Sequence, residues 1–572
     1  MKIAITGIGI ISAIGRNQEE TLASLQMEKS GIGPMQYLHS VHTDLPVGEV
    51  KLSNEQLRSL LQIPESEAFS RTSLLGLSAA REALQQAGVA DVHDMAFISG
   101  TTVGGMDTTE LYWEDWKKGQ KLEYIAQHEA GASTLKIAKH IGDFAYTTTP
   151  STACSSALNS LMIGANMLRT KKVSRALVGG TECLSKFHLN GFNTLMILDH
   201  RPCRPFDSTR AGLNLGEGAA YLVIEPEEEA VKRDANILGY IAGYGNACDA
   251  FHQTASSENG EGAYLAMSKA LEMANIAPSE IDYLNAHGTG TPNNDASESA
   301  AIHRLFGEIT PPISSTKSFT GHTTSASGSI ETVICLLCMQ NDFAPANLNW
   351  TKPEEQVIQP LVHNQPRQLE YVLCNSFGFG GNNSSLLLSK TIAPDLSIAE
   401  KEIEMCQSEL VEETDYKQYI SPAEARRMTS QTRLALAAAL KILDNNPCQP
   451  DAIICATQYG CMQNSVLFLN DMLRTHEMEL KPTPFIQSTH NTIASMVAIK
   501  LHNHGYNITY SHGTTSWQDA LQDVSMQMQL GLLQSALIIE FDEHVSDWNE
   551  KLEKVSSSSQ NIAKAQLITV KK

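Results

Sequence analysis

Residues 146–161, YTTTPSTACSSALNSL, place one cysteine where a β-type run gives way to an apolar, helix-like run. At the start of a helix the backbone N–H groups have no partners within the helix, and the positive end of the helix dipole lies there. Both effects favour a thiolate over a thiol. The neighbouring alanines and serines are small, which leaves room for a substrate. The pattern predicts that Cys154 is an anionic nucleophile, although an inert buried cysteine is the alternative for any cysteine taken alone.

The same pattern recurs near the C-terminus. Residues 506–521, YNITYSHGTTSWQDAL, align with residues 146–161 without a gap. In this register Thr514 stands at the position of Cys154. The last third of the chain is therefore predicted to be a second copy of the first, without its thiol. The flanking stretches repeat as well: AIICATQYGCM (452–462) echoes AFISGTTVGGM (96–106), and SALIIE (535–540) echoes RALVGG (175–180).

Short apolar runs that end in glycine alternate with runs of helical period along the chain. AFISG (96–100) is of the first kind and SLLGLSAAREALQQAG (73–88) of the second. This alternation predicts an α/β protein with layered sheets. A chain of 572 residues is also too long for one core. We expect four segments: a unit carrying the nucleophile over 1–230, a unit carrying two histidines over 231–395, an acidic, poorly patterned linker or strap over 396–425, and a degenerate unit over 426–572.

Composition excludes several classes of function. The formal charge is −21, from 42 basic and 63 acidic residues, which argues against a nucleic-acid or anionic-membrane surface. The first residues, MKIAITGIGIISAIG, carry one positive charge and are broken by glycines, so they predict a buried strand and turn, not a signal peptide. No apolar run is long enough to span a bilayer. Eleven scattered cysteines are typical of a reducing compartment, so we expect a cytoplasmic protein.

Two histidines lie in settings suited to act beside Cys154. NAHGTGTPNND places His287 just after a strand, at the edge where α/β proteins bind ligands. STKSFTGHTTSASGSIE places His322 in a turn that runs into a helix, and a helix N-terminus disfavours the imidazolium form. Lys317 and Glu331 flank this histidine as an orienting pair. A structural histidine is the alternative for each taken alone.

A glycine loop near residue 380 supplies backbone donors. NSFGFGGNNS places Phe377, Gly378 and Phe379 in a loop whose N–H groups can face an oxyanion. FGFGG and the early GIGII resemble nucleotide-binding loops only superficially. Neither matches GxGxxG with an acidic residue about 20 positions later, so a dinucleotide site is disfavoured.

Together and in this order, the motifs resemble the β-ketoacyl-acyl-carrier-protein synthases of the thiolase superfamily. The resemblance covers roughly residues 1–395. It implies a thiolase-like, layered α/β/α/β/α fold of two related halves, to which this chain adds a third, degenerate thiolase-like half. The motifs that carry it are TGIGIIS, GTTVGGM, STACSSAL, VGGTE, RPFDSTRAGLNLGEGAA, NAHGTGTPNND, STKSFTGH and NSFGFGGNN.

The resemblance also implies a role for each site residue. Cys154 is implied to be the nucleophile, and His287 and His322 the paired catalytic histidines. No metal or other cofactor is implied, because phosphopantetheine arrives on the carrier-protein substrate. The supporting roles implied are Lys317 and Glu331 as charged partners, Phe379 with Phe377 and Gly378 as gate and oxyanion loop, the N–H groups of Cys154 and Phe379 as oxyanion hole, and Thr289 and Thr291 as residues that bind the phosphopantetheine arm.

The implied reaction is a decarboxylative Claisen condensation, with acyl carrier protein as partner. An acyl group passes to the cysteine, malonyl thioester loses carbon dioxide, and the enolate attacks to give a 3-oxoacyl thioester. Two departures from the family pattern concern the face that docks the carrier protein. Ala211 stands where the family usually has aspartate, and IPESEAFSR (63–71) is acidic where relatives often present basic residues.

Three alternatives stay open. A degradative thiolase needs a second cysteine in the C-terminal glycine loop, and NSFGFGGNNS has none. A non-catalytic chain-length factor, which usually lacks the nucleophile, fits residues 405–572. There a purely stabilising domain attached to a housekeeping fatty acid synthase is the remaining alternative. An intact synthase fused to a degenerate first half resembles systems for aryl polyenes or related polyketide pigments.

The third unit is predicted to serve as a built-in partner. In this family two synthases dimerise through their first halves, and a tethered copy can make that contact within its own chain. We therefore expect a monomeric pseudo-dimer, with a homodimer as the alternative. KPTPFIQSTHN (481–491) resembles the segment that crosses into the partner's acyl pocket. Phe485 and Ile486 are predicted to line the far end of the Cys154 pocket, unless they are ordinary core residues.

Overall fold

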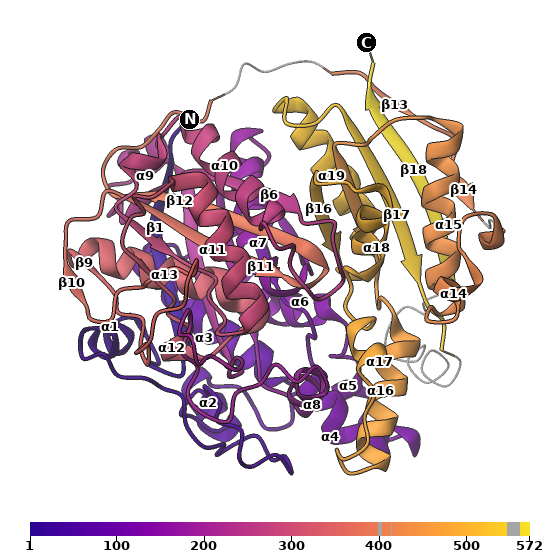
Figure 1. The fold of residues 1–572 in the computed structure, drawn as a ribbon, viewed down its shortest axis with the longest axis horizontal. Helices are drawn as coiled ribbons and strands as arrows, with labels where there is room; N and C mark the ends of the chain where they lie inside the picture. The colour runs from indigo at the N-terminus through magenta and orange to yellow at the C-terminus, as the bar shows by residue number, and fades with distance from the viewer. Residues whose placement is uncertain (398–402, 413–414, 546–560, 572) are drawn as a thin grey trace.

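The computed structural model describes residues 1–397, 403–412, 415–545 and 561–571, and its main strands form two sheets (Figure 1). The larger sheet has ten strands and is built from two halves that meet at β1 and β6. The smaller sheet has six strands and belongs to the C-terminal unit. No helix among the described residues is both long and apolar enough to cross a bilayer.

The first half of the large sheet is buried on both faces. Helix α3 (Arg71–Gln86) covers one face, and α7 (Ser156–Arg169) covers the other. Strand β1, IAITGIGIIS, is buried throughout, as expected for a continuous apolar strand between helical layers. Its Gly9 is required by close packing, because a Cβ there would lie 2.0 Å from the Ala79 carbonyl oxygen of α3. The strands in sheet order are β3 (Tyr146–Thr148), β2 (Met95–Gly100), β4 (Arg175–Glu182), β5 (Gly218–Pro226) and β1 (Ile3–Ser12).

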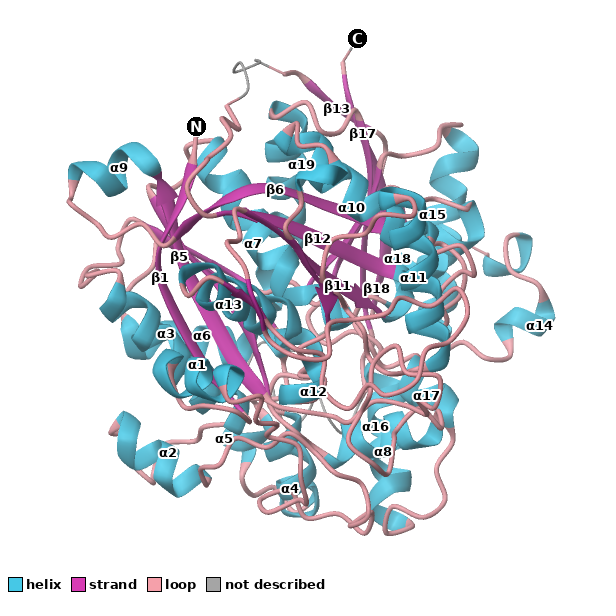
Figure 2. Cartoon of the chain, turned by 60° about the vertical axis from the view of Figure 1, so that its left-hand side comes forward, coloured by secondary structure: helices cyan, strands magenta, loops and turns pink. Residues whose placement is uncertain are grey.

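The second half repeats this layering. Helix α13 (Ser327–Gln340) packs beside α7 between the two halves, and nearly every residue of both helices is buried. Helix α10 (Glu261–Ala274) covers the outer face (Figure 2). The resulting α/β/α/β/α order confirms the predicted thiolase-like fold. The strands in sheet order are β6 (Gly239–Cys248), β12 (Asn382–Ser389), β11 (Tyr371–Gly378), β7 (Tyr283–Asn285) and β8 (Ile313–Ser314).

Shorter elements surround these layers. The helices are α1 (Gln18–Gln26), α2 (Asn54–Leu61), α4 (Met106–Lys117), α5 (Leu122–Ile125), α6 (Ala130–Ile141), α8 (Lys186–Thr194), α9 (Glu227–Lys232), α11 (Pro292–Phe306) and α12 (Lys317–Thr320). Strands β9 (Phe343–Ala344) and β10 (Gln365–Pro366) form a separate pair.

The C-terminal unit has the strand order of the first half. Strands β16, β15, β17 and β18 follow the order of β3, β2, β4 and β5, with the first three parallel and the fourth antiparallel in both sheets. The predicted repeat is thereby confirmed. In place of a long counterpart of β1, two short strands from the expected linker, β13 and β14, pair with β18. The strands are β13 (Met405–Gln407), β14 (Val411–Glu412), β15 (Ala452–Ala456), β16 (Tyr506–Tyr510), β17 (Ser535–Asp542) and β18 (Ile562–Val570).

Helices cover both faces of the small sheet as well. Helices α15 and α18 pack on one face and α19 on the other. Their bounds, with those of the shorter helices, are α14 (Pro422–Ala425), α15 (Ser430–Asn445), α16 (Met462–Arg474), α17 (Pro482–Ile486), α18 (Thr492–Leu501) and α19 (Ser516–Gln529).

The two sheets meet through β3 and β16 in a pseudo-symmetric contact. The Ser151 N–H donates to the Thr509 carbonyl at 2.8 Å, and the Ser511 N–H donates to the Thr149 carbonyl at 2.9 Å. In the alignment of the repeat, Ser511 is the counterpart of Ser151 and Thr509 that of Thr149. Equivalent patches of the two units therefore face each other, as in the isologous interface of a twofold dimer.

Candidate active site

Cys154 lies in a strained turn that leads into a long buried helix. The turn, residues 152–156, is called here the Cys154 elbow. It passes through a 3₁₀ turn, Ala153–Ser155, and enters α7. Ala153 has a left-handed φ of 53°, which is uncommon for a residue with a side chain. The Ser156 hydroxyl accepts from the Thr152 N–H at 2.9 Å and donates to the Ala153 carbonyl at 2.7 Å, which holds the turn.

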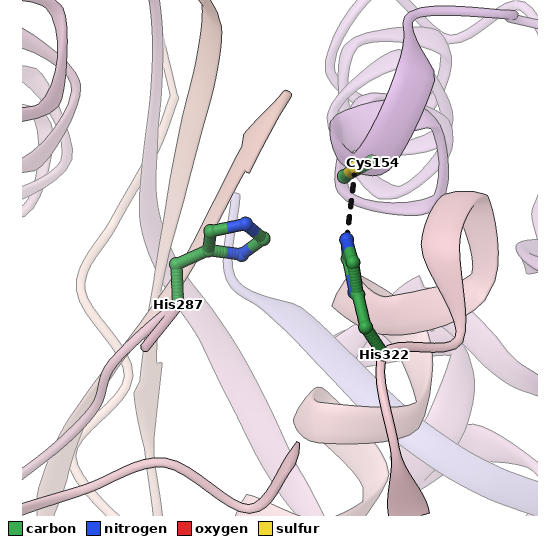
Figure 3. A group of neighbouring side chains, drawn as sticks. All are labelled: Cys154, His287 and His322. Carbon is green, nitrogen blue, oxygen red and sulfur yellow. Dashed lines mark hydrogen bonds between the residues drawn. The ribbon is translucent and has the colours of Figure 1, made fainter. Parts of the chain in front are cut away.

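The structure brings the three predicted catalytic residues together (Figure 3). Cys154 Sγ lies 3.1 Å from His322 Nε2. The rings of His287 and His322 are 5.3 Å apart and nearly perpendicular. Within this group, one sulfur or nitrogen atom of each residue lies within 4.8 Å of the others. Residues from three distant parts of the chain thus converge on one point.

The charge state of Cys154 differs from the expectation. Burial raises the pKa of its thiol to about 12, and the lowering effects of Lys317 and of the Phe379 N–H do not compensate. The side chain is only 6% exposed, so the start of the helix does not offset the lost hydration of a thiolate. In the resting site Cys154 is a thiol hydrogen-bonded to an imidazole.

Both histidines are neutral. Burial lowers the pKa of His287 and of His322 well below 6.5, and the nearby Lys317 ammonium lowers both further. The neutral ring predicted for His322 is therefore found, but burial is the main cause. His322 Nδ1 lies 3.0 Å from the Ser327 hydroxyl. Because a hydroxyl both donates and accepts, Ser327 can support either neutral tautomer of His322.

A buried ion pair joins the predicted supporting residues. Lys317 Nζ contacts Glu331 Oε1, and both side chains are at most 2% exposed. Burial raises the pKa of Glu331 to about 7, against the opposing effect of the ammonium. Sequence reasoning missed Glu298, whose carboxylate accepts from the His287 and Gly288 N–H groups at 2.8 and 2.7 Å. It lies eleven residues beyond His287, and no pattern in NNDASESA marks it.

The glycine loop lies against the sulfur. The N–H groups of Phe379 and Cys154 both lower the pKa of the thiol, so both are directed at it. A Cβ at Gly378 would lie 2.9 Å from the Thr152 carbonyl oxygen, which explains the need for glycine. Phe377 packs 5.7 Å from the His287 ring. Phe379 stacks on Phe192 at 5.5 Å.

Two cavities meet at Cys154. The larger, of about 340 Å³, contains the predicted arm-binding residues Thr289 and Thr291, whose hydroxyls are 2.9 Å apart. The smaller has about 50 Å³, well below the roughly 150 Å³ of a cavity that holds benzene, so an acyl chain needs side chains to move. Phe379 lines both cavities. The smaller cavity, called here the acyl pocket, is lined by Thr102, Val103, Met106, His128, Ala153, Cys154, Phe187, His188, Phe192, Thr324, Phe379, Tyr459, Ser465, Phe485, Ser488, Thr489 and His490.

The C-terminal unit forms part of the acyl pocket wall. Phe485 is 4% exposed, and its ring lies 5.6 Å from that of Phe192 and so close to Gly191 that a Cβ there would be 2.1 Å from it. Ile486, the other predicted lining residue, is partly exposed and is not among the residues described as lining the pocket. Successive residues of the short helix α17 point about 100° apart, so only one of the two faces the pocket.

The turn at Thr514 follows the same backbone course as the Cys154 elbow but carries an exposed threonine in place of the buried thiol. Gly513 has a φ of 62°, and Thr514 is exposed. His512, two residues earlier, contacts the hydroxyls of Thr149 and Thr147 through its two ring nitrogens, at 3.0 and 3.2 Å. It therefore serves the contact between the units.

Three family models match the chain. Residues 1–230 match the beta-ketoacyl synthase N-terminal domain, and residues 238–351 match the C-terminal domain of the same family. Residues 402–571 match a second model of the N-terminal domain. The sequence repeat and the matched family models agree on a degenerate copy of the first half.

Similar proteins and solved structures are also synthases of this family. The 3-oxoacyl-[acyl-carrier-protein] synthase 2 of Staphylococcus aureus (strain N315) is 32% identical, over 68% of this chain and 98% of that protein. The ishigamide ketosynthase/chain length factor is 29% identical, with a TM-score of 0.65, over 68% of this chain and 99% of that one.

Two further structures resemble the chain. The ketosynthase ApeO, solved in complex with its chain length factor ApeC from Xenorhabdus doucetiae, is 30% identical, with a TM-score of 0.59, over 68% of this chain and 98% of that one. The PfaC keto synthase-chain length factor shares the fold over the whole of this chain and 78% of its own, with a TM-score of 0.80 at 16% identity. By its matched domains and its relatives, the chain belongs to the beta-ketoacyl synthase family of acyltransferases.

Proposed function

We propose that the protein is a 3-oxoacyl-[acyl-carrier-protein] synthase of polyketide or polyene type, with its C-terminal unit as a built-in, non-catalytic partner. The observation that carries the chemistry is the convergence of the Cys154 thiol, two neutral imidazoles and two backbone N–H groups at one point. Acyl carrier protein is the proposed partner, and it brings the phosphopantetheine arm.

The first half-reaction loads the cysteine. The Cys154 sulfur attacks the thioester carbonyl of the acyl carrier protein while its proton passes to His322 Nε2, 3.1 Å away. The N–H groups of Cys154 and Phe379 stabilise the oxyanion. The pantetheine sulfur leaves with the proton, and the acyl group remains on Cys154.

The second half-reaction forms the carbon–carbon bond. Malonyl thioester loses carbon dioxide, and the electron pair of the broken bond forms an enolate whose oxygen accepts hydrogen bonds from His287 and His322. Neutral imidazoles suit this task, because they donate without carrying a charge into the buried site. The enolate carbon attacks the acyl-cysteine carbonyl. The Cys154 sulfur leaves as a thiolate and takes up one proton from the medium, because decarboxylation releases carbon dioxide and no proton. The product is a 3-oxoacyl thioester two carbons longer.

Contacts of the C-terminal unit support the built-in partner. Residues 509–511, at the end of its strand β16, exchange two backbone hydrogen bonds with residues 149–151, which follow β3, and Phe485 lines the acyl pocket. Asn491 Nδ2 donates to the carbonyl of the proposed gate, Phe379, at 2.9 Å. The internal pairing uses the surface that would otherwise join two copies, so we propose a monomeric pseudo-dimer. Size-exclusion chromatography with light scattering distinguishes it from a homodimer.

Aryl polyene or a related pigment is the proposed pathway. Two structures that resemble the chain at 29–30% identity carry chain length factor partners in their names. A housekeeping fatty acid synthase with a purely structural C-terminal unit is the second candidate, favoured by the similarity to 3-oxoacyl-[acyl-carrier-protein] synthase 2. Mass spectrometry of the 3-oxoacyl products formed from malonyl-carrier protein and either a polyunsaturated or a saturated acyl-carrier primer tests both, since the synthase itself reduces nothing. Elongation of the polyunsaturated primer supports the first, and elongation of the saturated primer alone supports the second.

A further inference from the structure

Thr324 has a left-handed backbone conformation, and smaller residues, Ala153 and Gly513, stand at the equivalent position of two similar turns. Residues 323–327 form a turn that enters α13 as the Cys154 elbow enters α7 and as the Thr514 turn enters α19. Thr324 has a φ of 45°, Ala153 has 53° and Gly513 has 62°. Left-handed φ is most unfavourable for a β-branched residue, and glycine or alanine serves in the other two turns. A threonine here needs a reason beyond the fold.

The hydroxyl of Thr324 has no partner within the described part of the chain. The residue is 5% exposed, and its Oγ1 is buried without a hydrogen bond. Its two neighbours are satisfied: Thr323 Oγ1 lies 3.3 Å from the Ser327 hydroxyl, and Ser325 donates to Glu182 at 2.6 Å. A buried hydroxyl left unpaired is unfavourable, because it has given up its hydrogen bonds to water.

Thr324 lines the acyl pocket, whose wall is more polar than a saturated chain requires. The turn that carries it packs against the Cys154 elbow. The imidazoles of His128, His188 and His490 line the same pocket, as do the hydroxyl residues Thr102 and Ser465. Thr102, His128 and His490 already contact hydrogen-bond partners in the protein, namely Glu182, Thr109 and Ser151, so the Thr324 hydroxyl is the group that an oxygen on the acyl chain would satisfy.

From the strained threonine, its unpaired hydroxyl and the polar wall, we infer that Thr324 determines acyl-group specificity. Its hydroxyl forms a hydrogen bond with an oxygen atom carried by the acyl group on Cys154. The enzyme then favours hydroxylated or carbonyl-bearing acyl groups over saturated ones. Because the two turns pack together, the oxygen lies near the thioester end, as in a 3-hydroxyacyl group. This inference rests on the proposed acyl transfer to Cys154.

The test compares two acyl donors on the full chain. Octanoyl-pantetheine and 3-hydroxyoctanoyl-pantetheine are incubated with wild type, Thr324→Val and Thr324→Ser, and the rate of adduct formation is followed by intact-protein mass. Wild type is expected to favour the hydroxylated donor. Thr324→Val keeps the β-branched shape and removes the hydroxyl, so the ratio of the two rates is expected to fall about tenfold, the effect of one hydrogen bond. Thr324→Ser retains the preference.

Thr332→Val is the matched control. Thr332 is buried on α13, but its hydroxyl already donates to the Gly328 carbonyl at 2.6 Å, so the rate ratio should not change. If Thr324→Val does not fold, Thr324→Ala replaces it, since the Cys154 elbow accommodates alanine at this φ. Equal rate ratios in wild type and the Thr324 variant would overturn the inference alone. A wild-type enzyme that takes neither acyl group would overturn the proposed function and this inference with it.

Discussion

The Cys154 elbow and the turn at Thr514 share one backbone course in two different environments. Each passes through a left-handed residue and a 3₁₀ turn into a long helix, and in each a serine hydroxyl caps the turn, Ser156 in one and Ser516 in the other. Cys154 is buried against two histidines, whereas Thr514 is exposed. The comparison shows that the fold supplies the turn and that residues from the second half supply the chemistry.

The two units also share a buried carboxylate at the end of an equivalent strand. Glu182 accepts from the hydroxyl of Thr101 at 2.9 Å, and in the C-terminal unit Asp542 accepts from the hydroxyl of Thr457 at 2.9 Å. These are equivalent positions at the ends of β4 and β17. The degenerate unit has kept the groups that hold its loops and lacks the half that would carry histidines. This pattern is expected of a partner that must present a shaped surface.

Removal of the thiol should have the largest effect. Cys154→Ala is expected to abolish acyl-enzyme formation, because no other described cysteine lies beside both histidines. Intact-protein mass after incubation with an acyl-carrier thioester measures it. Thermal unfolding serves as control, since the substitution removes a single heavy atom, the sulfur. A full adduct on the variant contradicts the assignment of the nucleophile.

Loss of His322 should slow decarboxylation by about 10²–10⁴-fold, the usual contribution of one catalytic group. The experiment uses Cys154→Gln, in which loading is blocked and the two histidines remain, and adds His322→Ala to it. Release of carbon dioxide from malonyl-carrier protein is the readout. Equal release in the single and double variants would remove His322 from enolate stabilisation.

Phe485→Ala should lengthen the products while the fold is retained. The ring lies between the acyl pocket and an aromatic cluster with Phe187 and Phe468, so its removal opens space and lowers stability by about 3–5 kcal/mol. Ile486→Ala is the matched control, because Ile486 lies next to it and points elsewhere. Product mass profiles decide the matter. Identical profiles for wild type and Phe485→Ala would reduce Phe485 to a core residue.

Asp519→Asn should stabilise the chain above pH 6. Asp519 accepts from the Tyr146 and Thr148 hydroxyls across the contact of the two units, at 2.8 Å each. Burial raises its pKa from 3.8 to about 6. The folded chain therefore binds a proton more readily than the unfolded chain, and this stabilisation is present below pH 3.8 and lost as the pH rises through 6.

The asparagine variant should remove this pH dependence, which amounts to roughly 2–3 kcal/mol. Unfolding midpoints in urea over this pH range provide the measurement. Parallel curves for wild type and variant would mean that Asp519 does not titrate on unfolding.

Thr514→Cys should not restore acylation to the Cys154→Ala variant, and this is the smallest expected effect of the series. An exposed thiol at this turn has no imidazole in place of His322. The variant is combined with Cys154→Ala and treated with the same acyl-carrier thioester, and peptide mapping locates any adduct. Labelling at residue 514 would show that the turn alone activates a thiol and would undo the comparison.

Much of the site could be predicted because its motifs are local. The seam at Cys154, the strand end at His287 and the turn at His322 are each visible within about ten residues. Glu298 and Thr324 were missed for different reasons. Glu298 acts through backbone N–H groups that no side-chain pattern reveals. Thr324 is one threonine in a run of hydroxyl residues, and it differs from Thr323 only in its unpaired hydroxyl and its place on the acyl pocket wall.

The sequence by itself determined the family, the repeat and the identity of the three converging residues, because these depend on short motifs in a fixed order. Only the tertiary structure decided the charge of Cys154, since desolvation depends on every group packed around the sulfur. It also decided that Phe485 and not Ile486 lines the acyl pocket, because orientation on a short helix is set by the surface it packs against. Periodicity predicts elements, whereas pKa values and pocket walls are properties of neighbours far away in the chain.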